Sequence, residues 1–200
     1  MASRGLAQGR VAVGLVHHPV VDKNGREISS AVTPTDLHDL ARSARTYGVE
    51  SLWIVTPLRD QQKLAARMMG FWQEGVGAGY NPNRGQALDL VRIVDSLELA
   101  LSGQGRIWEE EPLVWGTSAQ RGVPGGLNGR LGFGRAREII GSGRPVLLLF
   151  GTAWGLAPPA LDKCDDLLEP LSGPGEYNHL SVRSAAAVVL DRLLGRSEGD

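Results

Sequence analysis

The sequence predicts an α/β domain built on a mainly parallel β-sheet. Strand-like apolar runs recur along the chain with helical patterns between most of them, an alternation typical of parallel strands joined by helices. The chain has 200 residues and 42% hydrophobic content, which is enough to bury one core. We therefore expect a single domain over residues 10–195, flanked by small, polar, flexible tails at 1–9 and 196–200. The clearest runs are Val11–Val16, Leu52–Val55, Leu113–Trp115 and Val146–Phe150.

Composition excludes several classes of protein. The formal net charge of −1 excludes a uniformly basic nucleic-acid binder, so a polyanion would need local arginine clusters or a surface assembled from two subunits. The single cysteine, Cys164, cannot form an internal disulfide. The first residues contain no apolar signal core, and no apolar run approaches the roughly 20 residues that cross a bilayer. We expect a soluble, cytoplasmic protein with no membrane association.

The helix after the first strand has a clear amino-terminal signal. Thr33–Asp36 offers a capping threonine, a proline at the first helical position and an acid in the first turn, so the helix should begin near Pro34. The apolar residues after it turn His38, Arg42 and Arg45 together onto another face. This cationic stripe is either a solvated helix face or a polyanion contact. The apolar positions are Leu37, Leu40, Ala41, Ala44 and Tyr47.

Shorter elements are predicted farther along the chain. Val91–Val94 is a candidate strand, because Asp95 after it resembles the cap of a helix over Ser96–Leu101. Leu167–Leu168 is another candidate strand. Two glycine-rich stretches are expected to be surface loops, the second a mobile lid, and they are Gly75–Gly79 and Gly122–Gly134.

The last helical pattern is apolar nearly all round. Leu180, Val182, Ala185–Val189, Leu190 and Leu193 leave little room for a polar face. We expect this helix to pack on the sheet with one side and on a second subunit with the other. The alternative is a helix buried wholly within one subunit.

Two segments together predict a cofactor pocket. In Arg144–Leu156 a buried strand runs straight into a glycine-containing loop, and Tyr177–Val189 supplies a helix amino terminus. Such an arrangement lines a sheet edge with backbone N–H and C=O groups. That edge suits a ligand containing adenosine.

The same segments resemble motifs of a known family. Asp36–Val49 is similar to a first motif in which an arginine, here Arg42, lies on a helix that ends in an aromatic residue, glycine and valine. Phe150–Leu156 resembles the second motif and His179–Val188 the third, while Thr117–Ala119 is similar to a further family turn. The chain thus resembles the SPOUT superfamily of S-adenosylmethionine (SAM)-dependent RNA methyltransferases. The similarity is greatest to a bacterial branch found alone or fused to a tRNA guanine-N1 methyltransferase.

This resemblance implies a SPOUT-type parallel sheet with helices on both faces, a C-terminal deep trefoil knot and a homodimer. It implies that SAM is held largely by backbone groups of the loops Gly151–Leu156, Leu168–Ser172 and Tyr177–Ser181. The implied cofactor residues are Thr117, Ser118, Phe150, Gly151, Thr152, Gly155, Leu156, Leu171, Tyr177, Asn178, Leu180 and Ser181. No metal is implied.

The implied activity is methyl transfer to tRNA or rRNA. Arg42 and Ser181 are the candidate catalytic residues; an arginine is a poor general base, so Arg42 would orient the acceptor and stabilise developing charge. Arg42, Arg45 and Arg183 are candidate RNA contacts. Because the formal net charge is −1, a protein partner for RNA recognition stays open.

Departures from the family pattern leave the methylated atom open. Asp36 replaces an asparagine of the better-known branch, Ala153 replaces an acidic residue, and Ser181 and Arg183 replace asparagine and serine. The acceptor is therefore a ribose 2′-hydroxyl or a base nitrogen. Two other functions remain open: a catalytically silent module that binds cofactor or RNA, and a nucleotide-binding protein unrelated to RNA.

Other reactive side chains favour structural roles. His17 and His18 are adjacent at the end of the first strand and point to opposite faces, so they cannot readily chelate a metal together and are either structural or RNA-facing. No spacing places a histidine beside Cys164, which predicts a plain reduced thiol. The tryptophans are expected to anchor core or loops rather than stack on bases, and they include Trp72, Trp108 and Trp115.

Overall fold

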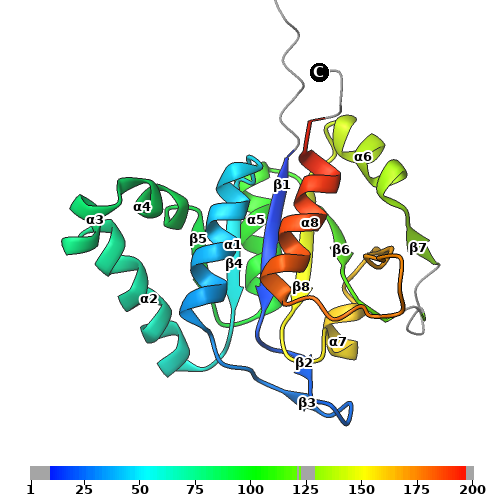
Figure 1. Cartoon of the computed structure of the whole chain (residues 1–200), viewed down its shortest axis with the longest axis horizontal. Coiled ribbons are helices and arrows are strands. Elements are labelled where there is room, and N and C mark those ends of the chain that lie inside the picture. Colours follow the sequence, from blue (N-terminus) through cyan, green and yellow to red (C-terminus); the bar gives the residue numbers. More distant parts are fainter. Residues whose placement is uncertain (1–9, 121, 123–128, 197–200) are drawn as a thin grey trace, which may run out of the picture.

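The computed structural model describes residues 10–120, 122 and 129–196. Its centre is a seven-stranded sheet in the order β5-β4-β1-β8-β6-β9-β7, in which every neighbouring pair is parallel (Figure 1). Each predicted strand is present, so the α/β prediction is confirmed. The predicted tails lie almost wholly outside the described residues. The strands are β1 (Val11–Val16), β4 (Ser51–Val55), β5 (Val91–Val94), β6 (Leu113–Gly116), β7 (Arg130–Leu131), β8 (Val146–Gly151) and β9 (Asp166–Leu168).

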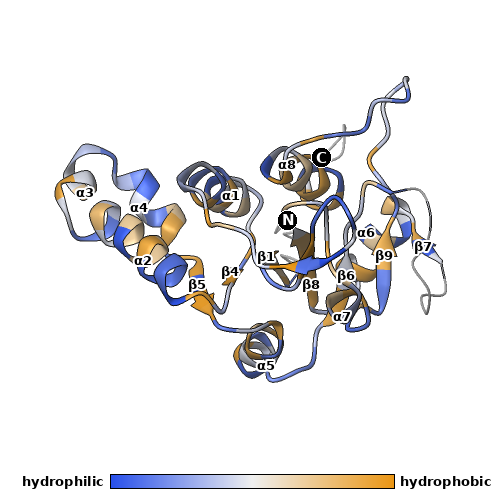
Figure 2. Cartoon of the chain, turned by 90° about the horizontal axis from the view of Figure 1, so that it is seen from below, coloured by the Kyte–Doolittle hydropathy of each residue, from blue (hydrophilic) through white to orange (hydrophobic). Residues whose placement is uncertain are grey.

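Helices cover both faces of the sheet. Figure 2 shows α1 and α8 on one side of the strands and α5 on the other. Side chains of β8 alternate between the two layers: Leu148 joins the core under α1 and α8, whereas Leu147 and Leu149 join the core under α5. The helices are α1 (Pro34–Thr46), α2 (Arg59–Gln73), α3 (Val76–Tyr80), α4 (Pro82–Leu88), α5 (Leu97–Trp108), α6 (Phe133–Gly141), α7 (Pro158–Leu161) and α8 (Val182–Leu194). Among the described residues, no helix is long and apolar enough to span a membrane.

The start of α1 is confirmed in detail. The backbone N–H of Asp36 donates to the Thr33 hydroxyl, and Pro34 occupies the first helical position. The predicted apolar positions of the helix are buried, except for Tyr47, which is half-buried at the carboxyl end. His38 does not lie on the exposed stripe with Arg42 and Arg45, because its ring packs edge-on against Trp72.

Two sequence-based boundaries were wrong. The cap of α5 is Ser96 rather than Asp95, because the Ser96 hydroxyl accepts from the N–H of Leu99 while Asp95 bonds Gln62 and Arg59. The helix also continues to Trp108.

The glycine-rich stretches are not simple surface loops. Gly75–Gly79 lies mostly in α3, and Gly77 is buried there because a Cβ would lie 2.6 Å from the Trp72 ring. Gly75 and Gly77 therefore serve close packing against α2, whereas a side chain at Gly79 would meet open space. In the second stretch, Arg130–Leu131 forms β7 and α6 begins at Phe133; residues 121 and 123–128 of the expected lid lie outside the described residues.

Helix α8 is buried on one side only within this chain. Ala186, Val189, Leu190 and Leu193 face the core, whereas Val188 is 37% exposed on the other side. The alternative of burial wholly within one subunit is therefore wrong. The exposed side combines Val188 with Ser184, Asp191 and Arg192, so the expectation of a helix that is apolar nearly all round is also wrong.

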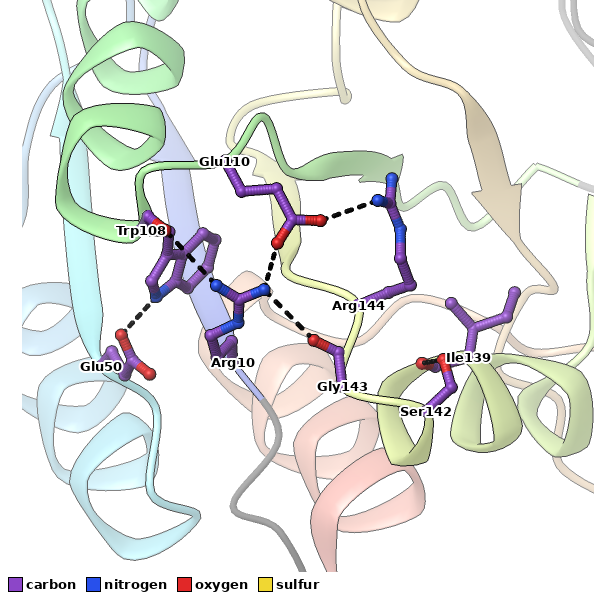
Figure 3. A network of polar contacts seen from close by, with 8 residues as sticks. All are labelled: Arg10, Glu50, Trp108, Glu110, Ile139, Ser142, Gly143 and Arg144. Atoms are coloured by element: carbon purple, nitrogen blue, oxygen red, sulfur yellow. Dashed lines mark hydrogen bonds and ion pairs between the residues drawn. The ribbon is translucent and has the colours of Figure 1, made fainter.

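A polar network lies at the amino-terminal ends of the strands β1 and β8 (Figure 3). The carboxylate of Glu110 accepts hydrogen bonds from both Arg10 and Arg144, the latter over 2.7 Å. Arg10 also donates to the carbonyl oxygens of Trp108 and Gly143. One carboxylate thus ties the start of β1 to the turns after α5 and α6.

Candidate functional site

A cavity of about 710 Å³ opens at the carboxyl ends of β8, β6 and β9. Loops that follow these strands meet there, as expected for a ligand site at the edge of a parallel sheet. The segment after β1 and the start of α8 complete the wall. The lining residues are Ser30, Ala31, Thr33, Asp36, Thr117–Gln120, Phe150–Gly155, Leu168–Leu171, Asn178–Arg183, Ala185 and Val189.

Most of the predicted cofactor residues line this cavity, although they come from distant parts of the sequence. Two do not. Leu156 is buried in the core under α5, and Tyr177 is 79% exposed with its ring against His179. The lining members of the predicted set are Thr117, Ser118, Phe150, Gly151, Thr152, Gly155, Leu171, Asn178, Leu180 and Ser181.

The loop after β8 is a tight turn held by its backbone. Ala153 and Gly155 both have positive φ, at 51° and 115°, and the N–H of Gly155 donates to the carbonyl of Thr152. A Cβ at Gly151 would collide with the backbone nitrogen of Leu156. Glycine is therefore required where the loop folds back beside the cavity.

A buried chain of hydrogen bonds supports the same loop. The hydroxyl of Thr152 donates to the carbonyl of Val16 over 3.0 Å, so the Ser30 hydroxyl must donate to Thr152 over 2.5 Å. Ser30 in turn accepts from Nδ1 of His17 over 2.9 Å. The chain of donors therefore requires a proton on Nδ1 of His17, which in the neutral ring leaves Nε2 without one.

The environment of His17 favours that neutral form. Its side chain is 0% exposed and its Nε2 has no hydrogen-bond partner among the described residues. Burial lowers the pKa of His17 to about 4, although the charge of Asp36 and the carbonyl of Ala31 act in the opposite sense. His17 is thus a structural support of the pocket, while His18 is half-buried near Glu27.

An ion pair crosses the mouth of the cavity between α1 and α8. The guanidinium of Arg183 bonds the carboxylate of Asp36 over 3.2 Å and lies 3.5 Å from that of Asp39. Asp36 also accepts from the Thr33 hydroxyl over 2.7 Å. Arg183 therefore lies at the cavity, as a candidate ligand contact should, but with its charge compensated by two acids.

The amino terminus of α8 also faces the cavity. The hydroxyl of Ser181 caps the helix by accepting from the N–H of Ser184. The side-chain amide of Asn178 donates to the carbonyl of Ala119 over 3.1 Å, joining two of the lining loops. These contacts hold Ser181 at the cavity wall.

The remaining candidates lie elsewhere. Arg42 and Arg45 are exposed on α1 and do not line the cavity of their own chain. Cys164 is buried, and burial raises the pKa of its thiol to about 12, so it is an unreactive thiol. Trp108 and Trp115 are core residues, as expected.

Sequence reasoning missed several lining residues. Ser30 and Ala31 follow a short hairpin of β2 (Val20–Val21) and β3 (Glu27–Ile28) whose course no pattern revealed. Glu169 also lines the cavity while its carboxylate accepts from the N–H of Phe133, at the amino terminus of α6. For Ser30 and Ala31, the available signal was the cluster of serine and threonine residues at 29–35, since hydroxyl groups often line ligand pockets.

Comparisons with known proteins agree on a family. A family model described as SAM-dependent RNA methyltransferase matches residues 10–195. A tRNA (guanine-N(1)-)-methyltransferase of Oleidesulfovibrio alaskensis is 43% identical over 181 residues, which are 90% of this chain and 41% of the relative. An uncharacterized protein of Aquifex aeolicus is 36% identical over 95% of this chain and 91% of its own length.

A solved structure shares the fold. The SpoU methyltransferase AviRb of Streptomyces viridochromogenes, in complex with AdoMet, superposes with a TM-score of 0.53 at 16% identity, covering 93% of this chain and 57% of that one. The present chain spans about two fifths of the length of the tRNA methyltransferase relative. Since the family model covers nearly all described residues, this chain belongs to the SAM-dependent RNA methyltransferase family.

Proposed function

We propose that this chain transfers a methyl group from SAM to RNA, with tRNA as the substrate. The observation that carries the proposal is the cavity itself. Loops after three neighbouring strands converge on it, and they contain most of the residues that the family resemblance implied for the cofactor. Its volume of about 710 Å³ is in the range of small-molecule sites. The named substrate of the Oleidesulfovibrio alaskensis relative supports tRNA, and a tRNA substrate supports a cytoplasmic location.

The residues of the cavity suit SAM. The turn at Gly151–Gly155 brings backbone close to the ligand space, and the walls at Thr117 and Leu171 combine a polar and an apolar side chain. When bound, SAM supplies a methyl group activated on a sulfonium. The chain's own task is to bind this ligand, exclude water and align the acceptor behind the methyl group, which can lower a barrier by several kcal/mol.

Ser181 and Arg42 are the residues we propose for the transfer step. Ser181 lies in the cavity wall at the amino terminus of α8, where it can position an acceptor group. Arg42 lies outside the cavity of its own chain, so its role in transfer requires a second subunit. Arg183 and Arg45 are proposed to contact RNA phosphates.

A homodimer follows from the same argument. Apolar side chains remain exposed beside the cavity and on α8, where a second copy would cover them. These side chains are Trp154, Leu180 and Val188. We also propose that the segment from β9 to α8 forms the family's trefoil knot. The contact of Asn178 with the carbonyl of Ala119 supports this, because it draws that segment against the loop after β6.

Two measurements test the function in sequence. Calorimetric titration with SAM and S-adenosylhomocysteine should show saturable binding near one site per chain. Transfer of labelled methyl from SAM to unfractionated tRNA should then be detected. No binding of either compound would refute the cofactor site, whereas binding without any transfer would leave a silent binding module instead of an enzyme.

A further inference from the structure

A second feature lies apart from the cavity, where α1 meets the helices α2, α3 and α4. These three helices form an arm that projects beyond the β5 edge of the sheet (Figures 1 and 2). Trp72 lies at the centre of the junction, with ring centroids of His38 and Phe71 at 5.8 and 5.1 Å in edge-to-face geometry. The guanidinium of Arg84 stacks over the Trp72 ring at 4.3 Å. We call His38, Arg42, Phe71, Trp72 and Arg84 the arm seam.

The arm seam holds positive charge that is poorly neutralised. Among the described residues, the guanidinium groups of Arg42 and Arg84 have no carboxylate partner, and Nε of Arg84 is buried without a hydrogen-bond partner. Arg144 and Arg183, in contrast, bind carboxylates directly. Both seam arginines act electrostatically on the same imidazole: burial first, then Arg84, and less strongly Arg42, lower the pKa of His38, while Asp39 raises it.

Aromatic surface accompanies this charge. Phe71 is 50% exposed on α2 although it touches Trp72, and Tyr80 on α3 is more exposed still. Single-stranded nucleic acid binds where bases stack on aromatic side chains and phosphates meet arginines. An apolar protein partner could cover the aromatic rings, but it would offer no negative charge to the unpaired guanidinium groups beside them. RNA offers both bases and phosphates.

We propose that the arm seam binds a single-stranded segment of RNA, with a phosphate at Arg84 and a base stacked on Phe71. Arg42, at the α1 side of the seam, adds a second positive charge for the backbone. The arm seam is separate from the cavity of its own chain, since none of its residues lines that space. Arg42 is the one seam residue that is also proposed for transfer, in the cavity of a second subunit. The proposal rests on the proposed function, because it places part of the RNA substrate outside the site of methyl transfer.

The test is equilibrium binding of fluorescently labelled, unfractionated tRNA to the full chain. Arg84→Gln and Phe71→Ala are compared with matched changes on α5, across the sheet: Arg106→Gln and Ile107→Ala. Ile107 is 53% exposed, like Phe71, and Arg106 is exposed. Each seam variant should weaken binding about tenfold, and Arg84→Gln should make the salt dependence shallower by about one released ion. The control variants should bind like the wild type.

Several outcomes would overturn the inference. The inference is overturned if the seam variants bind tRNA as tightly as the wild type. It is also overturned if the α5 variants lose as much affinity for tRNA as the seam variants do. A dimeric wild type that becomes monomeric with Phe71→Ala would identify the seam as a subunit interface instead. SAM titration checks folding, and if Arg84→Gln does not fold, the exposed Phe71→Ala variant decides alone.

The same experiment separates this inference from the proposed function. A wild-type protein that binds no tRNA at low salt would remove the tRNA substrate and the arm seam together. Wild-type binding that the seam variants leave unchanged would remove the seam alone.

Discussion

The buried His17 predicts a specific loss of stability in acid. In the unfolded chain this imidazole takes up a proton near pH 6.5, whereas in the folded protein its pKa is lowered to about 4 by burial. Between these values the unfolded state binds more protons, so the free energy of unfolding must fall as the pH falls. The difference corresponds to about 3 kcal/mol when fully expressed and to about 2.5 kcal/mol at pH 4.5.

The assay is urea unfolding at pH 7, 6, 5 and 4.5 for the wild type, His17→Gln and His18→Gln. Glutamine at position 17 can still donate to Ser30, but it does not titrate. The wild type and the His18→Gln control should lose about 2.5 kcal/mol more than His17→Gln between pH 7 and 4.5. Equal pH dependence in all three proteins would show that His17 is protonated in the folded state or that its burial is relieved in solution.

Four further predictions concern the subunit contact, the cofactor loop, the polar network and the transfer step. Val188→Glu should keep the fold and give monomers in sedimentation. Val189→Glu should instead unfold the protein, because it buries a charge in the core. A dimer that survives Val188→Glu would place the subunit contact elsewhere. Gly151→Ala should weaken SAM binding at least about tenfold in calorimetry, because the new Cβ displaces the loop, and unchanged affinity would contradict that geometry. Glu110→Gln should lower the free energy of unfolding by only about 1 kcal/mol, since the ion pairs at this half-exposed carboxylate are screened by water; a much larger loss in urea unfolding would show a better shielded network. Arg42→Ala should abolish methyl transfer while SAM affinity and dimerisation persist, and a loss of folding would instead give this arginine a structural role.

Local patterns predicted the elements whose determinants lie close together in sequence. The apolar run Val11–Val16 became β1 at the same boundaries, and the capping signal at Thr33 placed the start of α1 correctly. These features depend on a few neighbouring residues, so they can be predicted from a single sequence. Adjacent cap candidates were harder to separate: Asp95 and Ser96 are both good caps, and only the tertiary contacts of Asp95 with α2 decide between them.

Long-range contacts explain what could not be predicted. The pair of Arg183 with Asp36 joins residues 147 positions apart, and the contact of Ser30 with Thr152 spans 122. No periodicity encodes either one. The glycines of α3 were misassigned for a different reason: Gly77 packs on the ring of Trp72, which is close in sequence, but only the turn between α2 and α3 brings the two together. The order of strands in the sheet likewise depends on which strands meet in space.

The hydrogen-bond chain from His17 to Val16 has a consequence for ligand choice. Because Thr152 gives its proton to a carbonyl and Ser30 gives its proton to Thr152, neither hydroxyl has a proton left for a ligand. Each can only accept. This part of the cavity wall therefore favours ligand groups that donate a hydrogen bond, such as amino or hydroxyl groups. An analogue with only an acceptor at this position would find no donor on Ser30 or Thr152.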